Sequence, residues 1–517
     1  MKTGQEHIAS LRDGRAVFID GAAVPDVTTS PAFARIVQTA GSFYDAALEQ
    51  PEAFSFESPT SGAQVGRAWQ MPRTWEETVQ RRQTLERMAE LTCGMVGRSP
   101  DHVASTLVGM AMGADVMAGY DSRGSAALGD YFRQARDRDL YLSYVIVNPQ
   151  ADKSQPVAGQ PARDLVAHIV DEDAWGITVS GAKMLATSAI VAQELLVSNI
   201  QPLQEGDERY AFTAALPMNS KGLKFLSRRS YEQAATSSFD YPLASRFDEN
   251  DAVVLFDEVR IPWERVFLIR QVKAAAAQWH ETRAHVMQNH QCLVRLYVKL
   301  RFLVGVARRV AEANGIIGFP GVRDSLGALA AKATMIEAMV AGMEARGENF
   351  RGFHVPDRSM LCAAQAIAQQ TYPQVIDAIR QLCGGGLIMV PSSVQDFHHP
   401  ETLAIIRGSQ KSPVMDSEDR VKLFKLAWDA VGSEFGSRHL QYEMFYSGSP
   451  MVLNAHNYRF FDWGRATGMV DGFMNGYSAD AGGEAGSSAA VAQPSVAQSS
   501  VAQPSVDQSS IASTSTS

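Results

Sequence analysis

Hydrophobic residues recur at helical spacing toward both ends of the chain. In the first part the apolar positions lie between charged ones, and glycines and a proline stop the segment: Val79, Leu85, Met88, Leu91 and Met95, then Gly94, Gly97 and Pro100. Two more apolar faces come later, one formed by Leu293, Leu296, Leu300, Leu303 and Val304 and one by Leu326, Leu329, Ile336, Met339, Val340 and Met343. This periodicity predicts helical regions over residues 1–140 and 276–478.

Between residues 141 and 275 the pattern changes to short β-branched runs. These runs are Tyr144–Val147, Leu165–Val170, Gly176–Val179 and Ala252–Phe256, and polar turns such as Asn-Pro and Glu-Asp separate them. Strands in the middle with helices on either side predict an α+β fold of segregated layers. The helices after residue 276 are long enough to form a bundle.

Composition narrows the class of protein. A chain of 517 residues exceeds one ordinary core and predicts several domains. The net charge is −9 and lysines and arginines are not clustered, which argues against nucleic acid as a partner. We find neither an apolar signal core at the N-terminus nor an uninterrupted apolar stretch of about 18 residues, so we expect no membrane span and a cytoplasmic location.

The four cysteines are far apart in the sequence. Cys93, Cys292, Cys362 and Cys383 form no Cys-x-x-Cys pair, so we expect reduced thiols and no metal site.

The final segment, residues 479–517, differs from the rest of the chain. It repeats VAQPS-VAQSS-VAQPS-VDQSS and is dominated by Ser, Gln, Ala and Pro. Such a composition cannot bury a core, so we expect a disordered C-terminal tail. The alternative is that the tail acts as a tether.

Two polar segments carry most of the functional information. The pattern of Tyr144–Lys153 predicts a buried strand that ends in a polar loop at Asn148-Pro149. The pattern of Ser180–Ser188 predicts a strand, a turn and a second strand. Further landmarks follow in order along the chain: Asp13–Val17, Gly97–Asp101, Ala214–Ser220, Asp248–Asp251, Ile261–Glu264 and Gly432–His439.

These segments, taken in this order, resemble the oxygenase component of the 4-hydroxyphenylacetate 3-monooxygenase family over nearly all of residues 1–470. The resemblance implies an acyl-CoA dehydrogenase-like fold: an N-terminal helical domain (1–140), a middle β-barrel domain (141–275) and a C-terminal four-helix bundle (276–478), assembled as a homotetramer. It also implies a flavin-dependent monooxygenase that uses reduced FAD and O2. The reaction is hydroxylation of a para-substituted phenol ortho to its hydroxyl, through a flavin C4a-hydroperoxide. The branch that hydroxylates tyrosine-like and coumarate-like phenols is the most similar.

The resemblance assigns the phenol pocket to Arg98, His102 and Tyr144. A guanidinium stays charged and can stabilise a phenolate oxygen; the alternative for Arg98 is an ordinary loop arginine. The family usually has tyrosine at position 102 and histidine at position 144, so the two residue types are exchanged here. Either the hydrogen-bonding pair is kept with its sides swapped, or one of the two residues only lines a pocket for another substrate.

The resemblance also assigns flavin contacts. They are Tyr144, Val145, Ile146, Gln150, Ala151, Asp152, Lys153, Thr187, Gly384, Gly385, Arg438, Ser447 and Gly448. Thr187 is expected to donate to the ring near N5 or O4, and Lys153, in place of a usual arginine, to face a phosphate. The alternatives are a plain strand residue for Thr187 and a helix C-cap for the Gly384–Gly386 run.

A Rossmann or Walker motif is not found in the sequence. We therefore expect a separate flavin reductase to supply the reduced FAD.

Two other enzyme classes of the same fold remain alternatives. A dehydratase-isomerase lyase would hold an iron–sulfur cluster, for which Cys93, His285 and Cys292 are candidate ligands, but Gly97 stands where a fourth is needed. An acyl-CoA dehydrogenase with bound FAD would need a catalytic glutamate, which the sequence does not single out. A helical scaffold with an interaction tail is the non-enzymatic alternative.

Overall fold

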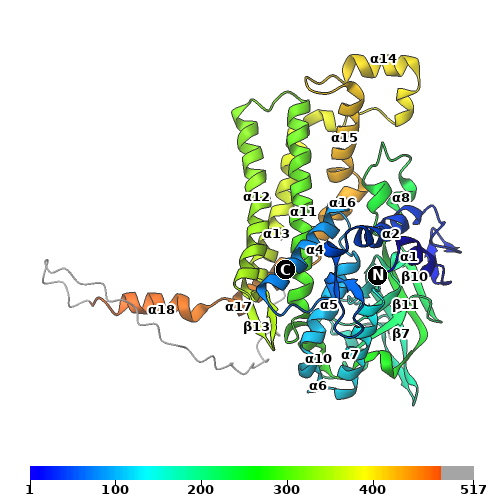
Figure 1. Cartoon of the computed structure of the whole chain (residues 1–517), viewed down its shortest axis with the longest axis vertical. Helices are drawn as coiled ribbons and strands as arrows, with labels where there is room; N and C mark the ends of the chain where they lie inside the picture. The colour runs from blue at the N-terminus through cyan, green and yellow to red at the C-terminus, as the bar shows by residue number, and fades with distance from the viewer. Residues whose placement is uncertain (163, 479–517) are drawn as a thin grey trace. The chain divides into compact units, whose positions relative to one another are not determined.

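Helices dominate the first 140 residues of the computed structural model, which describes residues 1–162 and 164–478 (Figure 1). They are α1 (Gly4–Ser10), α2 (Ala34–Glu49), α3 (Pro51–Phe54), α4 (Trp75–Glu90), α5 (Pro100–Met112), α6 (Ala114–Ala118) and α7 (Ser122–Asp137). Pro100 occupies the first turn of α5, where a missing amide hydrogen costs nothing. The predicted break at Gly94–Pro100 is therefore the loop between α4 and α5.

Part of the predicted helical domain belongs to a sheet. Strands β1 (Ala16–Ile19) and β2 (Ala22–Val24) form a hairpin, and β1 pairs in parallel with a strand of the middle domain. Val17 and Ile19 are buried in alternation with half-buried neighbours. Strands this short carry too few residues for a periodicity, so the helical prediction did not separate them. A second short hairpin is formed by β3 (Ser55–Glu57) and β4 (Gln64–Gly66).

The middle domain contains two sheets. The six-stranded sheet has the order β2-β1-β10-β11-β7-β6, and the four-stranded sheet has the order β12-β9-β8-β5. The strands are β5 (Leu142–Val145), β6 (His168–Glu172), β7 (Gly176–Thr187), β8 (Glu194–Val197), β9 (Phe212–Pro217), β10 (Leu223–Ser227), β11 (Asp251–Pro262) and β12 (Val266–Ile269). Short helices α8 (Tyr231–Ala234) and α9 (Ala244–Phe247) lie between β10 and β11.

The predicted strand–turn–strand over Ser180–Ser188 is wrong. Residues Gly176–Thr187 form one continuous strand, β7, that pairs antiparallel with β11. Gly181 has φ +109°, and a Cβ there would lie 2.4 Å from the carbonyl oxygen of Val166. The glycine therefore permits a close approach of backbone inside a strand and does not mark a turn.

Strand β5 lies at the seam between two hydrophobic cores. Successive side chains of a strand point to opposite faces. Accordingly Leu142, Tyr144 and Ile146 join a core shared with the helices, whereas Tyr141 and Val145 join a core shared with the sheets. This alternation places the Tyr144 ring on the helical side of the seam.

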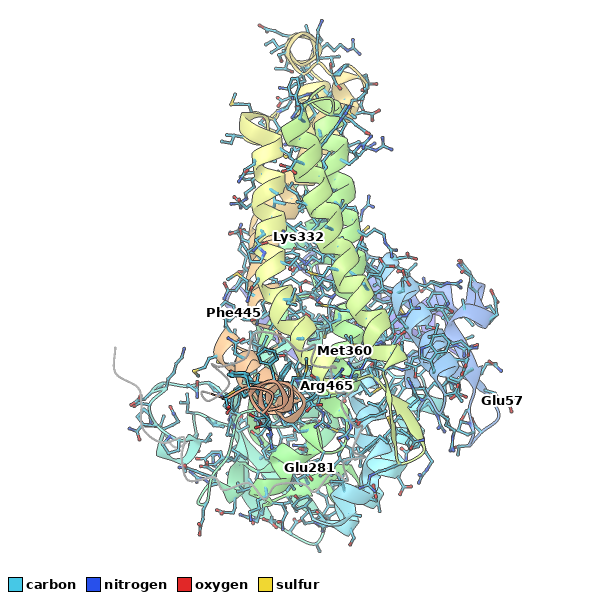
Figure 2. All side chains as sticks on the ribbon, turned by 90° about the vertical axis from the view of Figure 1, so that its left-hand side faces the viewer. Glu57, Glu281, Lys332, Met360, Phe445 and Arg465 are labelled. Atoms are coloured by element: carbon cyan, nitrogen blue, oxygen red, sulfur yellow. The ribbon has the colours of Figure 1, made fainter. Side chains whose placement is uncertain are left out.

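The C-terminal region is a bundle of long helices that run side by side (Figure 1). Its elements are α10 (Val272–His280), α11 (Ala284–Ala313), α12 (Pro320–Ala345), α13 (Arg358–Cys383), α14 (Pro400–Ser409), α15 (Ser417–Val431), α16 (Glu434–Phe445) and α17 (Pro450–Phe460), with a hairpin of β13 (Glu348–Phe350) and β14 (Phe353–Val355). In Figure 2, Lys332 lies midway along the bundle and Met360 lies nearer the end at which α13 begins.

Helix α12 is, among the described residues, the one helix long and apolar enough to cross a membrane by length and composition. It packs against α11 and α13 and buries Leu329, Ile336, Val340 and Met343. Helix α11 is the central element, because most of its first half is buried.

The contacts divide the chain into two units, Met1–Phe460 and Phe461–Ser517. All three predicted domains fall mainly within the first unit. In the second unit, α18 (Trp463–Met474) is capped by the side chain of Asp462. The predicted disordered tail, residues 479–517, lies outside the described residues.

Candidate functional site

The backbone of Arg98 is held by two side chains far away in the sequence. One carboxylate oxygen of Glu249 accepts the amide hydrogens of Gly97 and Arg98, both at 2.8 Å. The hydroxyl of Tyr141 donates to the carbonyl oxygen of Arg98 at 2.7 Å. A Cβ at Gly97 would lie 2.5 Å from the hydroxyl oxygen of Tyr442, so any larger residue would displace the Tyr442 ring. The loop before α5 therefore has a fixed conformation.

The Arg98 guanidinium lies between two phenol rings. It is 5.4 Å from the centroid of the Tyr144 ring and 5.1 Å from that of Tyr442. It also donates a hydrogen bond to the hydroxyl of Tyr442. Burial alone would lower the pKa of Arg98, but the surrounding Tyr144, Tyr442, Cys292 and Glu249 raise it above its usual value. Arg98 is therefore a permanent cation with only 7% of its surface exposed.

His102 and Tyr144 stack beside Arg98. Their ring centroids are 5.2 Å apart with an interplanar angle of 27°. Residues of α11 hold both rings. The Gln288 amide donates to the Tyr144 hydroxyl at 3.2 Å, Gln291 Oε1 lies 2.9 Å from His102 Nδ1, and the Cys292 thiol lies 3.7 Å from that nitrogen. Burial, and next the charge of Arg98, lower the pKa of His102 well below its usual value, so the ring is neutral.

The structure thus brings the three predicted pocket residues together. Arg98 comes from the loop before α5, His102 from the first turn of α5, and Tyr144 from β5. The assignment of these residues to catalysis stays a prediction.

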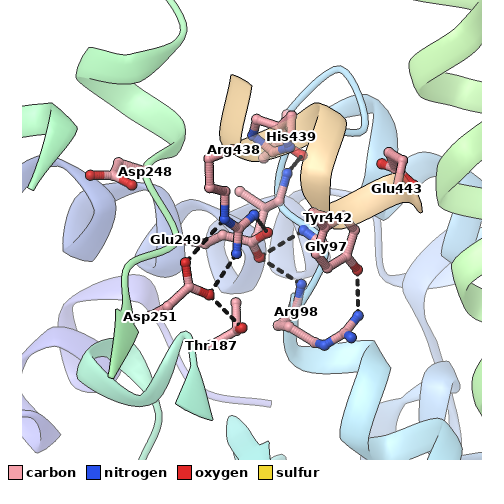
Figure 3. Close-up of polar contacts among 12 residues, drawn as sticks. Gly97, Arg98, Thr187, Asp248, Glu249, Asp251, Arg438, His439, Tyr442 and Glu443 are labelled. Atoms are coloured by element: carbon pink, nitrogen blue, oxygen red, sulfur yellow. Dashed lines mark hydrogen bonds and ion pairs between the residues drawn. The ribbon is translucent and has the colours of Figure 1, made fainter. Parts of the chain in front are cut away.

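Two predicted flavin contacts meet at Asp251 (Figure 3). The Thr187 hydroxyl donates to Asp251 Oδ1 at 2.6 Å, and Arg438 donates to the two Asp251 oxygens at 2.7 and 3.0 Å. Arg438 also donates to Glu249 Oε1 at 2.8 Å. Burial opposes ionisation of Asp251, but Arg438 and the other donors outweigh it and hold the pKa of Asp251 well below its usual value. Asp251 is therefore an ionised acceptor.

This geometry contradicts the role expected for Thr187. A hydroxyl has one hydrogen to donate, and that hydrogen is directed to Asp251. Thr187 therefore offers lone pairs and no free hydrogen to any ligand at this place. The charge of Arg438 is likewise shared between Asp251 and Glu249.

The other predicted flavin contacts are spread over several elements. Val145 and Ile146 are buried along β5 and its end. Gln150, Ala151, Asp152 and Lys153 lie in an exposed loop, where the amides of Ala151 and Asp152 donate to the side chain of Gln160 at 3.0 and 3.1 Å.

Gly384 and Gly385 follow α13 and are exposed. Gly384 has φ +55° and caps the helix, so the C-cap interpretation explains its glycine. Ser447 and Gly448 lie between α16 and α17. The carbonyl of Gly448 accepts from Gln369 at 2.6 Å, and the Ser447 hydroxyl oxygen is buried without a hydrogen-bond partner among the residues that the structure describes.

The residues that sequence reasoning missed are those that hold the pocket: Glu249, Asp251, Gln288, Gln291 and Tyr442. The run of acidic residues at 248–251 was recognised as a landmark without a role. On α11, Gln288, Gln291 and Cys292 lie at i, i+3 and i+4 on one buried face, and polar residues on a buried face are a usable signal.

The ligand set of the iron–sulfur lyase is not assembled. His285 packs against His280 and His456, with ring centroids 5.2 and 5.5 Å away, whereas Cys292 contacts His102. No group of three or more His, Cys, Asp or Glu side chains within residues 1–162 and 164–478 is placed to hold a metal ion.

Comparisons with known proteins show the family to which the chain is similar. Family models described as "4-hydroxyphenylacetate 3-hydroxylase N terminal" and "4-hydroxyphenylacetate 3-hydroxylase C terminal" match residues 3–268 and 275–475. A 4-hydroxyphenylacetate 3-monooxygenase oxygenase component of Geobacillus sp. (strain PA-9) is 34% identical over 87% of this chain and 92% of its own length. The oxygenase component of 4-nitrophenol 2-monooxygenase of Rhodococcus sp. is 35% identical, with 86% of each chain covered.

Solved structures extend the comparison. The oxygenase component of 4-hydroxyphenylacetate 3-monooxygenase in complex with FAD and 4-hydroxyphenylacetate superposes with a TM-score of 0.87 at 31% identity, over 92% of this chain and 99% of that one. An archaeal 4-hydroxybutyryl-CoA dehydratase superposes with a TM-score of 0.84 at 20% identity, over 92% and 95% of the two chains, and supports the fold alone.

Proposed function

The chain belongs to the 4-hydroxyphenylacetate 3-hydroxylase family, and from this premise we propose that it hydroxylates a para-substituted phenol ortho to its hydroxyl. It acts as the oxygenase component of a two-component flavin-dependent monooxygenase, as the names of its relatives indicate for those proteins. The observation that carries the proposal is the position of the Arg98 guanidinium between two phenol rings.

Arg98 already binds a phenol, which is the side chain of Tyr442. The guanidinium therefore suits a phenolic oxygen in both geometry and charge. We propose that a substrate phenol replaces the Tyr442 hydroxyl on Arg98. A buried cation at this place favours the phenolate, and ionisation raises the electron density at the ortho carbon. Tyr144 and His102 then fix the plane of the substrate ring by stacking and hydrogen bonding.

The cofactor is FAD, and the residues near β7 fit a reduced isoalloxazine. Thr187 and Arg438 both donate to Asp251, and Asn148, whose Oδ1 accepts from Lys183 of β7, has its Nδ2 buried without a partner among the described residues. A buried polar atom without a partner is rare, so a polar ring that pairs with Asn148 Nδ2 is a natural ligand. When bound, the reduced flavin supplies the activation of O2.

Thr187 favours the reduced form of the cofactor. Because its hydrogen is directed to Asp251, its oxygen can only accept. Reduced isoalloxazine has an N–H donor at N5, where the oxidised ring has only a lone pair. An acceptor at this position therefore binds the reduced ring and disfavours the oxidised one.

We also propose the partners and the location of the enzyme. A separate flavin reductase delivers the reduced FAD, since a nucleotide-binding motif for NAD(P)H is not found in the sequence. The four cysteines are free thiols, which fits the reducing cytoplasm. Large apolar side chains at the end of the bundle, Phe319, Ile388, Met389, Ile405 and Val414, are more than half exposed and support assembly into a homotetramer.

A turnover screen tests this function. The purified chain is mixed with a generic flavin reductase, NADH, FAD and O2, and a panel of para-substituted phenols is supplied. We expect at least one phenol to give the corresponding catechol, with O2 consumed in equal amount. Absence of catechol from the whole panel, with reductase and flavin shown to be active, would contradict the proposal.

A further inference from the structure

A relay of hydrogen bonds fixes the orientation of the His102 ring. The Gln291 amide nitrogen lies 3.2 Å from Asp101 Oδ2, and the Gln291 amide oxygen lies 2.9 Å from His102 Nδ1. Asp101 also accepts from the Ser99 hydroxyl. Asp101, His102 and Gln291 are each at most 2% exposed, so water does not compete for these bonds.

The relay determines which nitrogen of His102 carries the hydrogen. Burial raises the pKa of Asp101, but both of its oxygens accept hydrogen bonds, one from Ser99 and one from the NH2 end of Gln291, as those of a carboxylate do. The oxygen end of Gln291 then faces His102 and can only accept. Nδ1 of His102 must therefore be the protonated nitrogen, because a neutral imidazole has one donor and one acceptor. Nε2 carries the lone pair.

The Nε2 atom of His102 has no hydrogen-bond partner in the described part of the chain and is buried. An unsatisfied buried acceptor is costly and calls for an explanation. Its ring stacks on Tyr144, beside the Arg98 guanidinium. The lone pair thus lies in the group of residues proposed to receive the phenol.

We propose that His102 Nε2 is the base that accepts the proton of the phenolic substrate, and that Asp101 and Gln291 are the positioning residues that set its tautomer. This inference rests on the proposed function. In the step, the phenol O–H bond breaks, its electron pair stays on oxygen, and the proton forms a new bond to Nε2. The products are an imidazolium and a phenolate held by Arg98, so charge and atoms balance.

The surroundings of His102 fit this role. Its pKa is lowered by burial and then by Arg98, which keeps the ring neutral before substrate binds but also makes it a weaker base until the phenolate forms. A phenolate formed beside the imidazolium supplies the opposite charge that stabilises it. The titratable and charged groups around the ring are Arg98 and Asp101 from the α5 region, Tyr144 from β5, and Cys292 and Arg295 from α11.

The test uses two phenols that differ in acidity. The phenol of 4-hydroxyphenylacetate, like tyrosine with a pKa of about 10, needs a base near neutral pH. The phenol of 4-nitrophenol is largely ionised in mildly alkaline solution and needs none. Two variants are compared. His102→Gln removes the base. Gln291→Leu leaves His102 in place but removes the hydrogen bond that keeps the hydrogen on its Nδ1 atom. Melting curves show that each variant is folded.

If His102 is the base, His102→Gln loses about 100-fold or more in turnover of 4-hydroxyphenylacetate, the scale of general base catalysis. Its loss in turnover of 4-nitrophenol is much smaller, because only the positioning of the ring by His102 is lost there, and Gln291→Leu shows a smaller loss than His102→Gln with the same selectivity. An ultraviolet difference spectrum without flavin gives a second readout: the unaltered chain binds 4-hydroxyphenylacetate at pH 7 as phenolate, and His102→Gln binds it as the neutral phenol.

Two results overturn the inference and differ from each other. Equal losses on the two phenols, or a phenolate spectrum in His102→Gln, would overturn the role of His102 while the proposed function stands. Failure of the unaltered chain to hydroxylate either phenol or any other member of the panel would overturn the proposed function, and this inference with it.

Discussion

Arg438 and Glu249 form a buried ion pair in which Nη1 and Oε1 are 2.8 Å apart. The other oxygen of Glu249 accepts the amides of Gly97 and Arg98. One carboxylate therefore connects the loop of the phenol pocket to the arginine that also binds Asp251. A change in the Gly97–Arg98 loop should therefore alter the position of Arg438, and a change at Arg438 should alter the loop.

Glu249→Gln should weaken both sides of the site. The amide can still accept from the loop, but it cannot balance the charge of Arg438. Breaking a buried ion pair costs about 3–5 kcal/mol, so we expect a clearly lower melting temperature together with weaker phenol binding. The control is Glu264→Gln, which changes an exposed glutamate. If Glu249→Gln has an unaltered melting temperature and unaltered phenol binding, the ion pair between Glu249 and Arg438 does not stabilise the site, and the prediction is wrong.

Asp251→Asn tests the preference for reduced flavin. An asparagine can turn its NH2 group toward Thr187, which frees the threonine hydrogen for a ligand. The ratio of affinities for reduced and oxidised FAD should then fall by about 2- to 10-fold, the value of one hydrogen bond. Anaerobic titration of the two forms measures it, with Asp257→Asn on the exposed side of the same strand as control. If the unaltered chain, Asp251→Asn and Asp257→Asn all have the same ratio of affinities for reduced and oxidised FAD, the assignment of Thr187 as an acceptor is wrong.

Stability should fall as the pH decreases below about 6.5, the usual pKa of histidine. Burial lowers the pKa of His7, His102, His285 and His439 well below that value. The unfolded chain therefore binds protons in a pH range where the folded chain does not, and the free energy of unfolding decreases with decreasing pH. Each such histidine contributes up to about 1.4 kcal/mol per pH unit.

Chemical denaturation at several pH values between 7.5 and 5 measures this slope. His7→Gln, which removes one of these buried rings, should make the free energy of unfolding less dependent on pH by the contribution of about one proton, whereas His398→Gln, at an exposed position, should leave the pH dependence unaltered. A flat profile in the unaltered protein would contradict the neutral state assigned to these rings.

The exchange His102→Tyr with Tyr144→His tests whether the two residues act as a pair. The rings are stacked in contact, and contacting residues are usually coupled. We expect the double variant to recover more hydroxylation than the product of the two single losses, as measured by kcat/KM for one phenol. Independent losses would mean that one of the two residues only lines the pocket.

Much of this site could be foreseen from the sequence, but the parts that hold it together could not. The motif around Arg98 and the strand at Tyr144 are local signals, and the structure brings their side chains together. Tyr442 lies 344 positions from Arg98, and only the fold reveals that contact. The directed hydrogen of Thr187 could not be inferred either, because it depends on Asp251 across a strand pair.

The same limit applies to the fold. Long amphipathic helices such as α11 and α12 follow from periodicity, and the buried run at β5 follows from its β-branched residues. Strand β1 is too short to give a pattern, and β7 contains a glycine that mimics a turn. In both cases pairing with distant strands decides the structure.

The most direct test of the central claim is the fate of O2 in Arg98→Ala, supplied with reduced FAD and the phenol that the unaltered enzyme hydroxylates. Loss of a charge-assisted hydrogen bond in a buried site is worth about 2–4 kcal/mol, so catechol formation should fall about 30- to 1000-fold. Consumption of O2 should continue, with hydrogen peroxide released in place of catechol. Arg133→Ala, at an exposed position on α7, should behave like the unaltered enzyme. Undiminished catechol formation by Arg98→Ala would contradict the account.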